Sequence, residues 1–236
     1  MKFTTLRSTL CALVLAGTTI APVTAQTIDP DIAGFKLGLD VEQAQAKLTG
    51  INPDYQIREL QDNGKLVGLV GQVLNERRHT VDAMFVLASQ DGKIAQMTRF
   101  QRPEQGEGFM LNGLKEQLLG KYGTQMTATK VANIHTFQWQ QMRHGASADQ
   151  AIKCQNGLGK VQAGNARLIF TEQFFRECGL KVLVTAIDDG QGLVEQFTVH
   201  ISDDGKQSDE IRGEAQAQED KAAKEREQAK SGKAKL

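Results

Sequence analysis

The chain has few aromatic residues, and no long hydrophobic run follows its N-terminal segment. Aromatic residues make up 6% of the 236 positions, yet 40% of positions are hydrophobic, which is enough to bury a core. Lys, Asp or Glu interrupts every later hydrophobic run, so no later segment approaches the roughly 20 apolar residues of a membrane-spanning helix. We therefore expect no transmembrane segment.

The chain also lacks an excess of charge of either sign. It has 28 basic and 28 acidic residues. Because the first 25 residues contain two basic residues and no acidic one, the remainder has 26 basic and 28 acidic residues. Such a balance gives no electrostatic reason to expect nucleic acid or an anionic membrane as a partner.

Several familiar catalytic motifs are missing. The sequence has no Gly-x-Ser-x-Gly, no Ser-x-x-Lys and no His-Glu-x-x-His, and none of its Gly-Lys pairs is followed by Ser or Thr. We therefore expect no cofactor and no catalytic residues, and the sequence favours a non-enzymatic role without excluding an enzyme.

The N-terminal segment has the three parts of a secretory signal peptide. Lys2 and Arg7 are its only charges, an apolar stretch covers residues 10–16, and Val23-Thr24-Ala25 precedes the polar Gln26. We predict cleavage after Ala25 and a periplasmic or secreted product; the alternative is a packed N-terminal helix. Cys11 lies inside the apolar stretch, a position that argues against a lipid anchor.

Cysteine is scarce, with three residues in all, and Cys11 would leave with the signal peptide. Cys154 and Cys178 remain, 24 positions apart, and two cysteines in an oxidising compartment favour a disulfide. Closing such a loop would stabilise the fold by about 3 kcal/mol. A zinc site with His135 and His144 matches no familiar spacing. A redox-active pair would usually be Cys-x-x-Cys.

The rest of the chain predicts an α+β fold with an antiparallel β-meander and two short-to-medium helices. Asp40 and Gln43 form the pattern of a capping box before a helix that ends near Gly50, and a second helix is expected over 106–122. Tight turns are predicted at Asn63-Gly64, Asp91-Gly92, Asp189-Gly190 and Asp204-Gly205. Strands are expected at 54–61, 65–74, 80–89, 93–101, 125–130, 134–142, 166–172, 180–188 and 192–201.

Three segments follow from these elements. Residues 1–25 are the signal peptide, and 26–206 form the secreted domain, as one unit or as two sub-units split near 105–125. Residues 207–236 form a charged low-complexity tail, with seven acidic and seven basic residues from Asp209 onward and no aromatic residue. This composition is typical of either a solvated helix or a disordered tail.

Candidate binding residues are few. His135, Phe137 and Trp139 alternate on one face of the strand at 134–142 and are a candidate pocket or binding face, although a structural histidine with its hydrogen bonds satisfied is the commoner role for His135. His79 follows Arg77 and Arg78, a basic cluster more typical of a solvated loop than of an anion site. On the strand at 192–201, His200 is expected on the solvent-facing side.

A short segment carries a family resemblance. The run from Gly34 to Ala44, Gly-Phe-Lys-Leu-Gly-Leu-Asp-Val-Glu-Gln-Ala, resembles the G-x-x-L-G-M-[ST]-x-E-[EQ]-[VA] segment of the SmpA/OmlA outer-membrane lipoproteins, which are related in architecture to secreted β-lactamase-inhibitor proteins. This chain lacks their lipid-attachment cysteine. The region from Cys154 through Cys178, with Lys121-Tyr122-Gly123 and Trp139, resembles uncharacterised periplasmic proteins of Gram-negative bacteria. These resemblances imply a periplasmic address and an α+β fold, and no reaction.

Together these features favour a periplasmic, non-enzymatic binding or scaffold protein with an envelope protein as partner. Two alternatives stay open: an envelope-associated hydrolase without a recognisable motif, and a small-ligand carrier. The carrier would need an apolar cavity of several hundred Å³.

Overall fold

The computed structural model describes residues 30–62, 64–104, 107–143, 149, 154, 161–164, 167–170 and 177–231. The predicted signal peptide and His144 lie outside these residues. Within the described ranges, no helix combines the length and the apolar character needed to cross a membrane.

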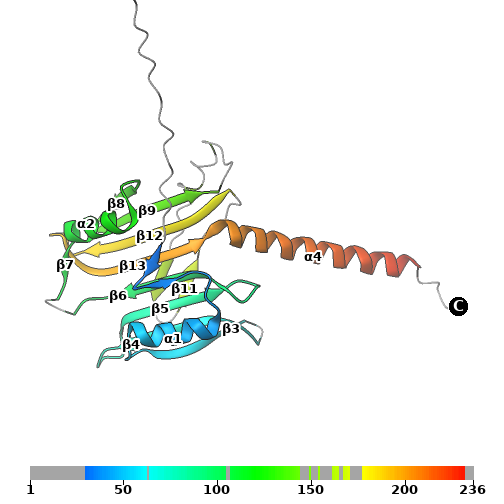
Figure 1. Ribbon diagram of the computed structural model, residues 1–236, viewed down its shortest axis with the longest axis horizontal. Helices are drawn as coiled ribbons and strands as arrows, with labels where there is room; N and C mark the ends of the chain where they lie inside the picture. The colour runs from blue at the N-terminus through cyan, green and yellow to red at the C-terminus, as the bar shows by residue number, and fades with distance from the viewer. Residues whose placement is uncertain are drawn as a thin grey trace, which may run out of the picture.

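One large antiparallel sheet dominates the molecule (Figure 1). Its strand order is β3-β4-β5-β6-β13-β12-β9-β8, and the short β7 pairs with β13 as a ninth strand. The sheet is built from β3 (Gln56–Asp62), β4 (Lys65–Leu74), β5 (Thr80–Ala88), β6 (Ile94–Gln101), β7 (Phe109–Met110), β8 (Thr127–Val131), β9 (Ile134–Met142), β12 (Cys178–Asp188) and β13 (Leu193–Asp203). The predicted α+β class and antiparallel meander are confirmed.

The sheet is made of two similar halves. In the first, helix α1 (Val41–Ile51) is followed by strands β3 to β6; in the second, helix α2 (Leu111–Tyr122) is followed by β8, β9, β12 and β13. Each half is therefore a helix followed by two antiparallel hairpins. The last strand of each half, β6 and β13, pair with one another at the centre of the sheet. Two units with the same order of elements are thus joined along one seam.

Both helices lie on the same face of the sheet, here called the helix face. Leu48 of α1 and Leu118 of α2 belong to one continuous apolar core with side chains from both halves, and Trp139 is fully buried in it. The Trp139 ring lies 5.4 Å from the Tyr122 ring, and its Nε1 donates to the Gly123 carbonyl at 2.8 Å. One core therefore stabilises both halves.

The N-terminal ribbon fills the space between the two helices. It consists of β1 (Asp31–Ile32) and β2 (Phe35–Lys36), and Phe35 is fully buried in the common core. The Tyr122 hydroxyl donates to the Asp31 carbonyl at 2.9 Å. At the start of α1, Asp40 and Gln43 form the predicted capping box.

A buried polar group attaches the chain that follows α1 to the sheet. The Tyr55 hydroxyl donates to Asp82 at 2.9 Å, and Arg99 donates to the same carboxylate at 2.8 and 3.2 Å. Burial, and then the charge of Asp82, raise the pKa of the Tyr55 hydroxyl well above its ordinary value. Tyr55 is therefore a hydrogen-bond donor at every physiological pH.

The opposite face, here called the hairpin face, differs from the sequence expectation. His200 was expected to face solvent, but it is fully buried, as are Thr98 and Ser202 beside it. Described parts of the segment between β9 and β12 contact this face: the Cys154 carbonyl accepts from Gln138 at 3.2 Å, and β10 (Val161–Gly164) contacts β13. Strand β10 pairs with β11 (Arg167–Phe170) to form a separate hairpin. The side chains of β13 therefore do alternate between the two faces of the sheet, but at His200 the hairpin face is buried as well.

The predicted disulfide is present between Cys154 and Cys178, at the start of β12. It ties the segment that crosses the hairpin face directly to a strand of the sheet. The predicted strand at 166–172 corresponds to β11.

The charged tail forms a long helix, α4 (Asp204–Ser231), which extends away from the sheet (Figure 1). It begins earlier than the predicted tail, so Asp204-Gly205 is its first turn and not a hairpin turn. The expectation was wrong because an Asp-Gly pair also suits a helix start, where Asp favours the positive end of the helix dipole.

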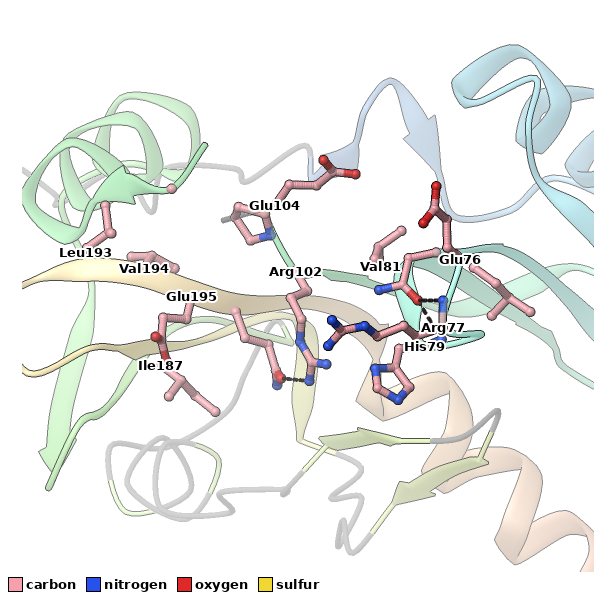
Figure 2. Close-up of a pocket in the computed structure, with 15 residues that line it drawn as sticks. Glu76, Arg77, His79, Val81, Arg102, Glu104, Ile187, Leu193, Val194 and Glu195 are labelled. Atoms are coloured by element: carbon pink, nitrogen blue, oxygen red, sulfur yellow. Dashed lines mark hydrogen bonds between the residues drawn. The ribbon is translucent and has the colours of Figure 1, made fainter. Parts of the chain in front are cut away.

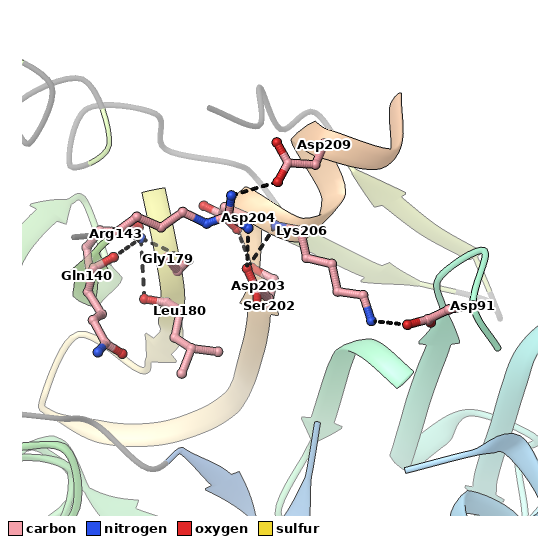
Figure 3. Close-up of polar contacts among 11 residues, drawn as sticks. Asp91, Gln140, Arg143, Gly179, Leu180, Ser202, Asp203, Asp204, Lys206 and Asp209 are labelled. Carbon is pink, nitrogen blue, oxygen red and sulfur yellow. Dashed lines mark hydrogen bonds and ion pairs between the residues drawn. The ribbon is translucent and has the colours of Figure 1, made fainter. Parts of the chain in front are cut away.

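Ion pairs hold the first turns of α4 against both halves of the sheet (Figure 3). Lys206 Nζ lies 2.8 Å from Asp91 in the β5–β6 turn, and Arg143 Nη1 lies 2.7 Å from Asp209. Hydrogen bonds, first from Lys206 and then from Ser89, lower the pKa of Asp91 below its ordinary value. The direction of the helix is therefore set by contacts at its base.

Two glycines of α4 give opposite predictions for the same substitution. A Cβ at Gly205 would lie 2.2 Å from Arg143 Nε and 2.3 Å from the Cys178 carbonyl oxygen, whereas a Cβ at Gly213 would meet nothing within 4 Å. We expect Gly205→Ala to lower the free energy of unfolding by about 1–3 kcal/mol through overpacking. Gly213→Ala should raise helix content, because alanine favours a helix by about 1 kcal/mol. Urea unfolding and far-UV circular dichroism measure the two effects; equal effects at both positions would contradict the close packing at Gly205.

Candidate functional site

The three residues predicted as a binding face lie inside the protein. Phe137 and Trp139 are buried in the core beneath α2. His135 is 9% exposed, and its Nε2 lies 3.1 Å from an Asp188 carboxylate oxygen. The three share one face of β9, as predicted, but none of them lines the groove described below.

Clusters with the composition of a metal site were also considered. No group of three or more His, Cys, Asp or Glu side chains suited to a metal is found within the described part of the chain. Cys154 and Cys178 are joined to one another, and His144 lies outside the described residues.

A groove of about 1070 Å³ lies beside the central seam of the sheet (Figure 2). Both halves contribute to it. The first half supplies the β4–β5 turn and the segment after β6; the second half supplies the end of β12 and the beginning of β13. Its lining residues are Leu74, Asn75, Glu76, Arg77, His79, Val81, Arg102, Pro103, Glu104, Gly108, Ile187, Leu193, Val194, Glu195 and Gln196.

The β4–β5 turn presents Arg77 and His79 to this groove. The Asn75 side chain accepts from the backbone N–H of Arg77 at 3.1 Å and of His79 at 2.9 Å, which closes the turn. Arg78 adopts a φ of 60°, a left-handed conformation that turns the chain between its two neighbours. The local hydrogen bonding therefore holds the backbone of the turn from which Arg77 and His79 reach the groove.

Arg102 enters the groove from the segment after β6. Its backbone N–H donates to the Val81 carbonyl at 2.8 Å, extending the pairing of β5 and β6 by one bond. Its guanidinium donates to Gln196 of β13 at 3.1 Å and lies 5.8 Å from the centre of the Phe100 ring. The side chain is thus positioned by residues of both halves, and Figure 2 shows it and Arg77 pointing toward one another.

Acidic residues also line the groove. Glu76 and Glu104 lie on one side of the arginines in Figure 2, and Glu195 lies farther along β13. The groove is therefore of mixed charge, with a basic centre and carboxylates around it.

A second polar cluster is buried on the hairpin face. Lys181 Nζ lies 3.1 Å from Asp204, and the Ser202 hydroxyl donates to the same carboxylate at 2.6 Å. The Lys181 and Asp204 side chains are 1% and 3% exposed. A substrate cannot reach these groups without displacing what covers them. The cluster therefore joins the base of α4 to the sheet and is not an accessible site.

His200 lies beside this cluster. Its Nδ1 is 2.8 Å from the Thr98 hydroxyl, across the seam between β13 and β6. Burial, and then the positive charge of Lys181, lower the pKa of His200 to about 3, while Asp204 acts in the opposite direction. The imidazole is therefore neutral at physiological pH.

This pKa predicts how stability depends on pH. An unfolded histidine titrates near pH 6.5, so below that pH the unfolded state binds a proton that folded His200 does not. The protein should lose about 1.4 kcal/mol of unfolding free energy per pH unit through this residue, between about pH 6 and the folded pKa. Urea unfolding between pH 8 and pH 4 measures the slope, which should be shallower in His200→Gln. At pH 8 histidine is neutral in both the folded and the unfolded state, so the difference in unfolding free energy between the unsubstituted chain and His200→Gln reports only the change in packing. Equal slopes in the two proteins would contradict the lowered pKa of His200.

Sequence reasoning found part of the groove and missed the rest. It identified the basic cluster at 77–79 and read it as a solvated loop. Arg102 was missed, although its position directly after a predicted strand was a usable signal, because nothing local shows that β6 ends beside the β4–β5 turn and β13.

No family model, curated protein or solved structure matches this chain.

Proposed function

We propose that this chain is an exported, non-enzymatic module that binds a protein component of the cell envelope, and that the partner occupies the groove beside the central seam. The observation that carries this proposal is the groove itself, which is open, of mixed charge and lined by both halves of the sheet. Export is supported by the basic start, apolar stretch and small residues of the first 25 positions.

The size and chemistry of the groove fit a segment of another protein. A volume of about 1070 Å³ is at the upper end for small-molecule sites, which are mostly apolar. Here the apolar side chains of Val81, Ile187 and Leu193 line the groove together with charged ones. A small apolar ligand would leave those charges unpaired, whereas a peptide can pair with charged and apolar groups together.

The buried acid and base groups argue in the same direction. His135 with Asp188, and Lys181 with Asp204, are each paired within the protein and at most 9% exposed. None of the four lines the groove. The groove carries acid and base groups of its own, His79 with Glu76, Glu104 and Glu195. Over the described residues, however, no hydrogen bond or ion pair joins the His79 ring to a carboxylate, so no acid–base pair is assembled there as a hydrolase would need.

Site-specific crosslinking tests the binding function. A photoreactive residue at Glu104, in the groove, should give a discrete crosslinked product with an envelope protein in living cells. The matched control is the same photoreactive residue at Glu116, an exposed position on α2 that does not line the groove. Equal products at both positions, or no product at Glu104, would contradict the proposal.

Export is tested separately by fractionation. We expect the protein released by osmotic shock to begin at Gln26, because the predicted cleavage follows Ala25. N-terminal sequencing measures this directly. Recovery of the full-length chain, starting at Met1, in the cytosolic fraction would overturn the proposed location.

A further inference from the structure

Two guanidinium groups, those of Arg77 and Arg102, point toward one another in the groove, and neither is paired with a carboxylate of a described residue. Over the residues that the structure describes, neither Arg77 nor Arg102 forms an ion pair, whereas Arg99 is paired with Asp82 and Arg143 with Asp209. Both residues are exposed, so water solvates each guanidinium, and an anionic group placed between them would be attracted by both positive charges. The arrangement is therefore suited to an anionic group lying between the two.

Both side chains keep donors for such a group. Arg102 uses one of its N–H groups on Gln196, and its contact with the Phe100 ring, 5.8 Å from the ring centre, uses no donor. The turn closed by Asn75 holds the backbone of Arg77. A planar carboxylate can accept two parallel N–H bonds from a guanidinium, and this geometry gives both strength and orientation.

The surrounding charges narrow the class of ligand. Glu76, Glu104 and Glu195 line the same groove and would repel a polyanion or an anionic membrane surface. They tolerate a single negative charge held at the centre. Leu74, Val81 and Pro103 add apolar surface beside the arginines, which suits the neighbours of an acidic residue in a peptide.

We propose that Arg77 and Arg102 form a carboxylate subsite at the centre of the groove, which receives an acidic side chain of a bound protein segment. This subsite rests on the proposed binding function and specifies the chemistry by which the partner is recognised. It predicts that a glutamate in the partner contributes more to affinity than an uncharged residue of the same shape.

A matched pair of peptides tests the subsite. The probes are acetyl-Leu-Glu-Leu-amide and acetyl-Leu-Gln-Leu-amide, titrated at low salt into the processed chain with its disulfide intact. The Arg side-chain N–H signals are followed by nuclear magnetic resonance. We expect the Glu peptide to bind at least fivefold more tightly than the Gln peptide, with the shifts centred on Arg77 and Arg102. Arg77→Gln and Arg102→Gln should each abolish the preference.

Arg58→Gln is the matched control. Arg58 is exposed on β3, bonds Gln72 at 3.0 Å and does not line the groove, so its loss removes the same charge elsewhere. It should leave the preference intact, and thermal unfolding verifies that all variants fold. Equal affinity for the two peptides, no binding of either, or a preference unaffected by both groove substitutions would overturn the subsite. Inorganic phosphate that shifts the same signals at lower concentration than the Glu peptide would overturn the carboxylate assignment in favour of a phosphate.

The two proposals can fail separately. If the crosslink at Glu104 persists while the peptide preference is absent, the groove binds a partner by other contacts. If the crosslink is absent, the binding function itself fails, whatever the peptides show.

Discussion

The pairing of β6 with β13 is the contact on which the rest of the structure depends. It joins two units of one helix and four strands, with Phe197 opposite Gln101 and Ser202 opposite Gln96. Without it, each half would present an unpaired edge strand of backbone N–H and C=O groups. The seam also gives the two helices a common face, so that one core forms where separate halves would have two small ones.

The groove follows from the same seam. Arg102 continues β6, Gln196 lies on β13, and their hydrogen bond crosses from one half to the other. The β4–β5 turn then brings Arg77 to the opposite side. Neither half alone contains the complete groove, so the proposed binding function requires the joined sheet.

Burial of polar groups is the main cost of covering both faces. Each buried charge must be paired within the protein, because its desolvation is otherwise unfavourable by several kcal/mol. Lys181 and Asp204 meet this requirement together, and the neutral state of His200 removes a further charge. The same groups join the first turn of α4 to the sheet, so the start of this helix is held in place although the helix has no apolar stripe to pack against a core.

The sequence by itself determined the elements whose signals are local. The predicted capping box at Asp40 is present, and the strands predicted at 65–74 and 134–142 have the same bounds in the structure. The disulfide was predicted from the number and spacing of the cysteines. Only the tertiary structure decided that His200 is buried, that β6 meets β13 and that Arg77 faces Arg102. Local patterns report capping and alternation, which depend on neighbours in the chain. Burial and convergence depend on segments far apart in sequence, and no local pattern records which of them meet.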